Sequence, residues 1–187
     1  MTRLMRKLVR LRKDEDGATA IEFGMLAAPF LLLLVGVFES GTMLLVNYQL
    51  DDAVADTARL IRTGQAQEAG MNAEAFKKAV CDRIVLKIGD CKSKLLVDVD
   101  TFADFSSLSF PPALEEKTNP DGTKTKVLSS SVGKKFDIGT AKTIVGVRVY
   151  YPYHYMTGIF AKITGMTDYD DVKLLSTAAA FQNEPFK

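Results

Sequence analysis

One ionisable side chain interrupts the most apolar stretch of this 187-residue sequence. Between Ala18 and Phe38, Glu22 is the only charged residue, and the stretch includes the run PFLLLLVGVF. A charge at the centre of a membrane-spanning helix costs about 2.5 to 3.5 kcal/mol on insertion scales, and less near the interface, so such residues usually mark function. Glu22 is therefore the first candidate functional residue.

A partner for Glu22 arises if the chain is cut after Gly17. Ala18 would then carry a new α-amino group, and Glu22 would be the fifth residue of the shortened chain. One helical turn separates the two groups, so they could neutralise each other within one chain or between packed chains. A carboxylate in the first turns also suits the positive end of the helix dipole.

The two cysteines, Cys81 and Cys91, are the next residues capable of chemistry. A disulfide is the leading assignment if their segment lies outside the cytoplasm, and two free thiols or a redox pair are the alternatives. Their spacing is not C-x-x-C, which argues against a redox pair. Because a disulfide needs Cα atoms about 4.4 to 6.8 Å apart, a helix from Cys81 through residue 88 would have to stop early, or residues 86–91 fold back.

Residues that could support catalysis or metal binding are few. His154 is the only histidine, so any Ser-His-Asp or Cys-His mechanism would pass through it, and its place among three tyrosines favours an ordinary strand end. The acids of DYDD at 168–171 could attract calcium, but the EF-hand spacing and its glycine are missing. The sequence also lacks a phosphate-binding glycine loop, zinc-ligand spacing and a basic stripe, and its net charge is +1. We expect no catalytic residue, metal, cofactor or nucleic-acid partner.

The elements that would position Glu22 lie at the N-terminus. Residues 1–17 form a basic leader, and residues 18–38 are long enough to cross a membrane as a helix. The basic residues should stay in the cytoplasm, which places the rest of the chain outside. A cleaved signal peptide and a plain anchor are the alternatives. The apolar run exceeds the usual signal-peptide core of about 7 to 15 residues, and no A-x-A-like cleavage site follows it.

Residues 39–64 predict an amphipathic continuation of the same helix, ended by Gly64. Pro29 lies inside the apolar part, which is consistent with an ordinary kinked anchor or with a helix that bends as it packs with others. The amphipathic part needs a cover for its apolar stripe, and a sheet from the C-terminal half is the candidate. The stripe consists of Met43, Val46, Leu50, Ala53, Thr57 and Leu60.

Residues 65–187 predict an α+β domain outside the membrane. A second amphipathic helix is expected from Asn72, its N-cap, to a stop at Gly89. Alternating apolar residues predict strands within residues 94–102 and 143–153, and a third strand is expected within 171–185.

The sequence also predicts the structure of two connections in this domain. The turn signal NPDG at 119–122 favours a hairpin or excursion in the polar stretch 106–142. Residues 155–165 predict a short helix ending at Gly165. The expected fold class is α+β, with a long N-terminal helix packed on a small antiparallel sheet.

Gly17, Glu22 and Phe23 together resemble the processing motif of type IV prepilins. More closely, GATAIEFGMLAAPFLLLLVGVFESG is similar to the TadE-like family of the tight adherence (Tad, type IVb/Flp-type) pilus system. The resemblance covers residues 13 to about 62 and reappears in DCKSKLLVDV and in the terminal NEPF. It implies a pilin architecture, cleavage between Gly17 and Ala18 by a prepilin peptidase on the cytoplasmic side, and methylation of the new amine.

The residues and the resemblance lead to one hypothesis. The chain is a TadE-like pseudopilin or minor pilin of the bacterial inner membrane, with a cytoplasmic N-terminus and a periplasmic domain. Its partners are the prepilin peptidase, other pilin subunits and the pilus assembly machinery, and it is not an enzyme. Glu22 and Phe23 act in assembly, and Leu31 to Val35 supply apolar packing. The alternative is an unprocessed, single-pass, membrane-anchored periplasmic scaffold or binding protein.

Overall fold

The computed structural model describes residues 16–86 and 89–186. Most of the expected basic leader, residues 1–15, lies outside the described residues. The chain divides into two compact units, of which the first ends at Ser40 and the second begins at Gly41. Each unit is described separately below.

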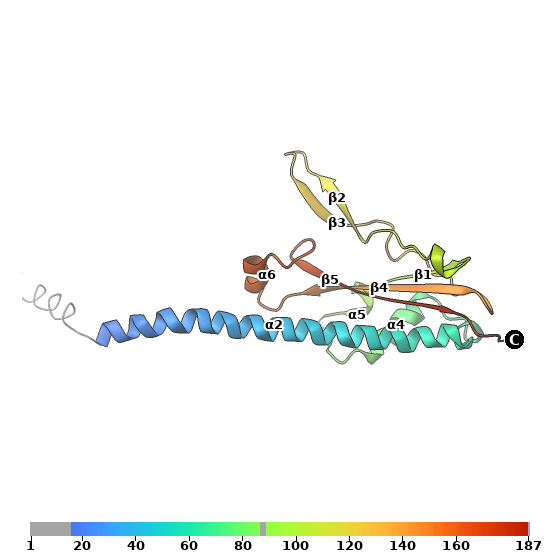
Figure 1. Cartoon of the computed structure of the whole chain (residues 1–187), viewed down its shortest axis with the longest axis horizontal. Coiled ribbons are helices and arrows are strands. Elements are labelled where there is room, and N and C mark those ends of the chain that lie inside the picture. Colours follow the sequence, from blue (N-terminus) through green and yellow to red (C-terminus); the bar gives the residue numbers. More distant parts are fainter. Residues whose placement is uncertain (1–15, 87–88, 187) are drawn as a thin grey trace, which may run out of the picture. The chain divides into compact units, whose positions relative to one another are not determined.

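The first unit contains the N-terminal part of a single helix, α2, which runs from Asp16 to Arg62 (Figure 1). The helix continues through Pro29 without a break in its assignment, so the proline does not end it. A proline in a membrane helix can be accommodated because local adjustments satisfy the freed backbone groups. The expected helix over residues 18–38 is therefore present as part of a longer one.

The second unit begins with the remaining part of α2, which is amphipathic as expected. Its buried side chains recur every three or four residues and form one stripe: Val46, Leu50, Ala53, Val54, Thr57, Ala58 and Ile61. α2 ends at Arg62, and Gly64 adopts the left-handed conformation (φ 84°) that glycine accepts without a steric penalty. The predicted stop at Gly64 is confirmed.

Three antiparallel strands form the main sheet in the order β1-β4-β5. β1 runs from Leu96 to Phe102, β4 from Ile144 to His154 and β5 from Val172 to Gln182. In the register, Val147 of β4 pairs with Val99 on one side and with Ala179 on the other. All three strands lie where alternation or composition predicted them.

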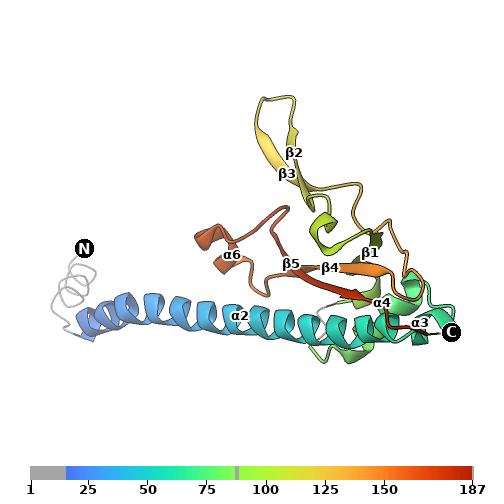
Figure 2. The ribbon, with the colours of Figure 1, turned by 45° about the vertical axis from the view of Figure 1, so that its right-hand side comes forward.

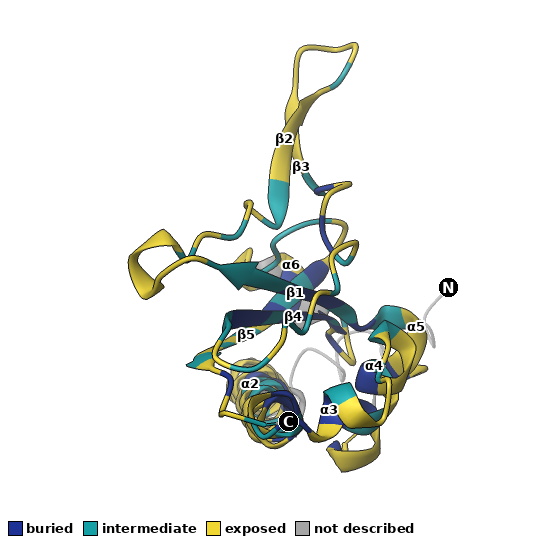
Figure 3. Cartoon of the chain, turned by 90° about the vertical axis from the view of Figure 1, so that its right-hand side faces the viewer, coloured by how far each residue is buried: buried dark blue, intermediate teal, exposed yellow. Residues whose placement is uncertain are grey.

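The core lies between the sheet and the second part of α2. Figure 3 shows the short helix α3 (Gln65–Glu68) and α4 (Ala73–Arg83) on the same side of the sheet as α2. One cluster of buried residues joins α2 to the inward faces of the strands: Val97, Val99, Val145, Val147, Val149, Tyr151 and Tyr153. The α+β architecture, with a long N-terminal helix and a small antiparallel sheet, is as predicted.

The second helix is shorter than predicted. α4 begins after Asn72, whose side chain accepts a hydrogen bond from the Ala75 backbone as an N-cap, but it ends at Arg83 rather than near Gly89. Ile84 is already extended, and a short helix, α5, covers Cys91–Lys94. The early end has a physical reason, since ten residues of continuous helix would separate the two cysteines by about 15 Å.

A two-stranded hairpin occupies the middle of the expected polar stretch. β2 (Leu114–Thr118) and β3 (Lys124–Leu128) pair antiparallel around the turn at residues 119–122. The hairpin stands away from the main sheet in Figures 1 and 2, and most of its residues are exposed in Figure 3. It follows a short 3-10 helix, η1 (Phe105–Ser107). The turn signal therefore predicted the hairpin correctly.

The connection between β4 and β5 carries the last helix, α6 (Ile159–Thr164). Gly165 follows it in the left-handed conformation and acts as its C-cap, as the sequence predicted.

Candidate functional site

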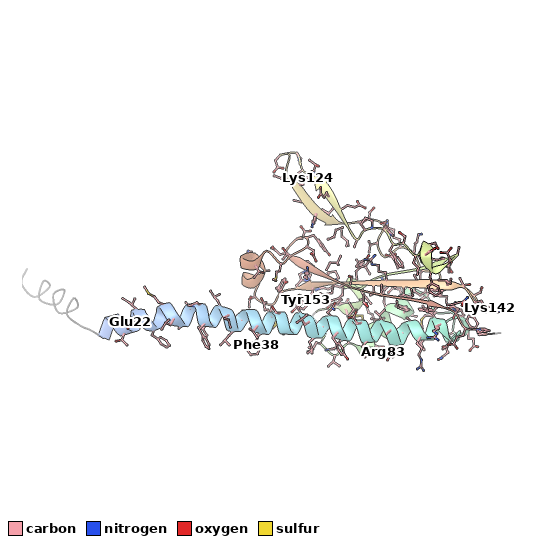
Figure 4. All side chains as sticks on the ribbon, viewed as in Figure 1. Glu22, Phe38, Arg83, Lys124, Lys142 and Tyr153 are labelled. Carbon is pink, nitrogen blue, oxygen red and sulfur yellow. A yellow bond between two sulfur atoms is a disulfide. The ribbon has the colours of Figure 1, made fainter. Side chains whose placement is uncertain are left out.

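Glu22 lies on the exposed surface of α2, within its apolar N-terminal part (Figure 4). Its large neighbours are also exposed, with exposed fractions of 73% for Phe23 and 73% for Leu26. Among the described residues, none forms a hydrogen bond or ion pair with the Glu22 carboxylate. The Glu22 carboxylate is thus a charge on an apolar helix face with no hydrogen bond or ion pair among the described residues.

The exposed apolar side chains of the first unit form what we call the N-terminal apolar surface. It consists of Ile21, Phe23, Met25, Leu26, Phe30, Leu31, Leu32, Leu33, Val35, Val37 and Phe38. Exposed apolar patches of this extent on a protein mark contact with a membrane or another protein. Within the described residues, α2 is the one helix that is long and apolar enough to cross a membrane. Its most apolar 18 residues have a mean hydropathy of 2.2. Length and composition thus fit membrane anchoring.

Gly17 and Ala18 lie in the first turn of α2, which begins at Asp16. Glu22 follows one turn later on the same helix, which is the spacing that the sequence analysis used. The structure therefore keeps the three positions on one continuous element.

The disulfide between Cys81 and Cys91 is present, with a Cα–Cα distance of 5.9 Å. Cys81 lies in the last turns of α4 and Cys91 begins α5, and both are buried, so the bond is part of the core. The intervening loop is also fixed to α2, because Gln49 Oε1 accepts hydrogen bonds from the backbone N–H groups of Val85 and Leu86. This geometry is that of a structural crosslink.

The other candidates for chemistry are scattered. His154 is exposed at the end of β4, opposite Val172 of β5. Asp168 accepts hydrogen bonds from the Leu174 backbone N–H and from Lys173 Nζ, so it ties down the start of β5. Burial raises the pKa of the neighbouring Tyr169, with smaller contributions from Asp170 and Asp168. Across residues 16–86 and 89–186, no group of three or more His, Cys, Asp or Glu side chains could hold a metal ion.

Asp98 of β1 is an acid that fixes a distant segment of the chain. Asp98 is only 6% exposed, and its carboxylate accepts hydrogen bonds from the backbone N–H groups of Gly133, Lys134 and Lys135. Asp98 thereby fixes the segment that leads from the hairpin back to the sheet. Alternation along a strand carries no signal for a partner that is about 35 residues away.

The loop before the hairpin packs against the outer face of the sheet. The Arg148 guanidinium lies 5.8 Å from the centroid of the Phe110 ring and 5.2 Å from that of Tyr150. Such stacking of a cation on aromatic faces is favourable and keeps the loop before the hairpin against β4. Sequence reasoning missed this contact because Phe110 lies in a stretch without periodicity.

Comparison with known protein families connects this geometry to the sequence resemblance. Residues 17–59 match the family model of TadE-like proteins. The resemblance inferred from the motif is confirmed over this segment, which begins at Gly17 and contains Glu22 and Phe23. The matched segment includes most of α2 and ends before α3. Searches of curated proteins and of solved structures found no match for the chain.

The family match and the apolar helix together indicate the general class of protein. A TadE-like segment indicates a protein associated with a tight adherence pilus system, and α2 provides a helix capable of anchoring it in a membrane. Both features lie on the same element, so Glu22 is part of the segment that carries the family likeness.

Proposed function

We propose that this chain is a pseudopilin or minor pilin that acts in the assembly of a tight adherence pilus. The single observation that carries the proposal is the position of Glu22 within a TadE-like segment, on an exposed apolar helix that offers it no partner among the described residues. The helix inserts in the bacterial inner membrane with the basic leader on the cytoplasmic side, and the α+β domain lies in the periplasm.

Cleavage supplies the missing positive charge. A prepilin peptidase cuts between Gly17 and Ala18, and the new α-amino group of Ala18 lies one helical turn from the Glu22 carboxylate. The two charges neutralise each other within one chain or across two neighbouring chains. Leaving either charge unpaired in an apolar stack would be unfavourable, so the pair favours one axial stagger of the subunits over others.

The N-terminal apolar surface supplies the rest of the assembly contact. Its side chains, which include Leu31, Leu32, Leu33 and Val35, contact lipid before assembly and neighbouring helices afterwards. Gly24, with no atom within 4 Å of an added Cβ, leaves room for a second helix to approach closely. The exposed Leu44, Leu45 and Tyr48 extend the apolar contact beyond the membrane part of α2.

The direct test of this proposal is the N-terminus of the protein in the envelope. The full chain with a C-terminal tag is expressed together with the pilus system of its own organism, purified from membranes and analysed by intact-mass spectrometry. We expect a chain that begins at Ala18, with or without one added methyl group. A chain that still begins at Met1 would contradict the proposal and favour an unprocessed membrane-anchored scaffold.

A matched pair of variants sharpens the test. Gly17→Ala places a side chain at the proposed cleavage site, and we expect the leader to be retained. Gly24→Ala makes the same substitution further along the helix, where nothing lies within 4 Å of an added Cβ, and processing should continue. Equal processing of both variants would mean that Gly17 has no role in cleavage.

A further inference from the structure

Gln49, on the second part of α2, brings two sets of exposed apolar side chains together. Its Oε1 accepts hydrogen bonds from the backbone N–H groups of Val85 (2.8 Å) and Leu86 (3.1 Å), in the loop after α4. Leu45 precedes Gln49 by one helical turn and therefore lies on the same side of α2. The exposed side chains of the helix and the loop form what we call the composite apolar surface: Leu44, Leu45, Tyr48, Val85 and Leu86.

The composite apolar surface lies within an uncharged part of the chain. Residues 41–50 of α2 contain no charged side chain, and neither do residues 84–86 of the loop. Exposed apolar patches mark contacts with another protein or a membrane, and an uncharged one favours an apolar partner. The N-terminal apolar surface of α2 in a second copy of this chain has that chemistry. Under the proposed function neighbouring helices already contact Leu44, Leu45 and Tyr48, so a loop bound to Gln49 widens the same contact.

The loop itself has little to hold it against α2 apart from the disulfide. Of residues 84–86 only Ile84 is buried, and the Val85 side chain is 83% exposed, so apolar burial beyond Ile84 contributes little. At the end of α4, Nε of Arg83 lies 3.7 Å from Oδ2 of Asp56, and ion pairs this exposed are weak (Figure 4). The hydrogen bonds to Gln49 compete with water.

The disulfide supplies the missing constraint. Cys81 precedes the loop and Cys91 follows it, and the bond holds their Cα atoms 5.9 Å apart. Joining the two ends of a loop reduces the number of conformations that it can adopt. Val85 and Leu86 are then kept near Gln49, where two hydrogen bonds are enough to fix them.

Formation of this bond is an oxidation. The thiols of Cys81 and Cys91 lose two protons and two electrons to the disulfide of a thiol–disulfide oxidase, which is reduced to a dithiol. Such oxidants act outside the cytoplasm, so a newly made chain stays reduced until its domain is exported. In the folded domain both cysteines are buried, which keeps an attacking thiolate away from the bond. Oxidation is therefore a step that the folded domain does not readily reverse.

We propose that the disulfide between Cys81 and Cys91 is a maturation latch, whose closure fixes the loop on Gln49 and completes the composite apolar surface for the α2 helix of a neighbouring copy. In the reduced chain the loop leaves α2, and Val85 and Leu86 leave the surface with it. Only an exported and oxidised chain then presents the whole surface. The identity of the partner rests on the proposed function, whereas the latch is a property of the domain alone.

The latch can be tested by hydrogen exchange at single amides of the full chain in mild detergent. Three proteins are compared: the oxidised wild type, the double variant with Cys81→Ser and Cys91→Ser, and Gln49→Ala. The last of these keeps the disulfide and removes the acceptor of the two loop amides, so it gives the exchange of an undocked loop. The Val147 amide of β4 reports whether the sheet is intact.

We expect the double variant to lose protection of the Val85 and Leu86 amides several-fold, down to the level of Gln49→Ala. The Val147 amide should stay protected in all three proteins. Val85 and Leu86 amides that keep the wild-type protection in the double variant would overturn the latch. The leader is intact and no pilus component is present, so this result does not depend on cleavage or assembly.

The partner is tested in variants that keep the disulfide. Two copies of the chain with different C-terminal tags are expressed together with the pilus system, and their co-purification is measured. Val85→Asp places a charge on the composite apolar surface, and Phe105→Asp makes a matching change on an exposed ring of η1. We expect Val85→Asp to lower co-purification several-fold and Phe105→Asp to behave like the wild type.

Equal co-purification of the two variants would overturn the contact with a neighbouring copy, and so would wild-type copies that do not co-purify. The mass of the N-terminus in the same preparations tests the proposed function separately. Failure of the contact and failure of the proposed function are therefore distinguishable.

Discussion

Apolar side chains are exposed in the first part of α2 and buried in the second part. Leu31, in the part that ends at Ser40, is 58% exposed, and Leu50, in the part that follows, is completely buried. The first part carries large apolar side chains all round, and the second carries a stripe of mainly small and medium ones against the sheet. One helix thus contains two different surfaces. The later part packs against the sheet of the same chain, and the large apolar side chains of the earlier part are exposed.

Two acids show the same contrast. Asp98 is buried and receives backbone hydrogen bonds from three consecutive residues of its own chain. Glu22 is exposed among apolar residues and receives none from the described residues. A buried carboxylate is tolerable when its hydrogen bonds are satisfied, and an acid in an apolar setting requires compensation. Asp98 thus helps to complete the fold, whereas Glu22 has no such role among the described residues.

The largest expected effect on stability comes from the buried stripe. Leu50→Ala should lower the free energy of unfolding by about 2 to 5 kcal/mol, because it leaves a cavity in the core. Leu31→Ala makes the same change on the N-terminal apolar surface and should leave the stability of the domain nearly unchanged. Urea unfolding of the full chain in mild detergent, followed by near-ultraviolet circular dichroism, measures both. Similar losses for the two variants would mean that the two parts of α2 do not differ as described.

The disulfide should contribute the next largest effect. It closes a loop with a sequence separation of 10 residues. For a loop of this length, the entropy of the unfolded chain predicts a stabilisation of about 2 to 3 kcal/mol. The double variant with Cys81→Ser and Cys91→Ser should show this loss in the same unfolding assay. An unchanged midpoint after reduction of the wild-type protein would rule out a stabilising role.

The end of α2 offers a smaller and more local test. A Cβ added at Gly64 would lie 2.5 Å from Cγ of Phe186, and φ at this position is 84°. Gly64→Ala should therefore cost about 1 to 2 kcal/mol from the left-handed backbone alone, with an added cost for displacing the ring. In a Phe186→Ala background only the backbone cost should remain, so a double-mutant cycle separates the two contributions. Additive losses would show that the ring does not contact this position.

The smallest effect is expected in the hairpin, which packs little against the core. The Thr123 hydroxyl, followed by the Thr123 backbone N–H, lowers the pKa of Asp121 below its usual value of 3.8. A lowered pKa means that the contribution of Asp121 is present above the unfolded value and is lost as the pH falls through the folded one. As the pH falls through the lowered pKa of Asp121, the protection of the Thr123 amide relative to its intrinsic exchange rate should fall, while that of the Val99 amide in the sheet is unaffected. Hydrogen exchange measures both amides, and equal acceleration of the two would argue against a local effect.

The sequence predicted the elements that have local signals. Gly64 and Gly165 marked helix ends, alternation marked β1 and β4, and the turn at 119–122 marked the hairpin. These features depend on residues close together in the chain, which is why periodicity and turn chemistry found them.

Contacts between distant residues were not predictable in the same way. The amphipathic pattern after Asn72 predicted a helix to Gly89, but α4 ends at Arg83 and the disulfide joins Cys91 to it. The partners of Asp98, and the approach of Tyr155 to Met43, join residues from separate elements. Such contacts depend on the packed fold, so only the structure could locate them.

The most direct test of the central claim, that the Glu22 carboxylate pairs with the amine that cleavage creates, is pilus assembly by a neutral variant. Glu22→Gln keeps the shape of the side chain and removes its charge, and Glu74→Gln makes the same change on an exposed acid of α4. Both proteins would be checked for cleavage at Gly17 and then scored for co-purification with pilus subunits from the envelope. We expect Glu22→Gln to be cleaved but to lose most of its co-purification, while Glu74→Gln behaves like the wild type. Normal co-purification of Glu22→Gln would contradict the claim.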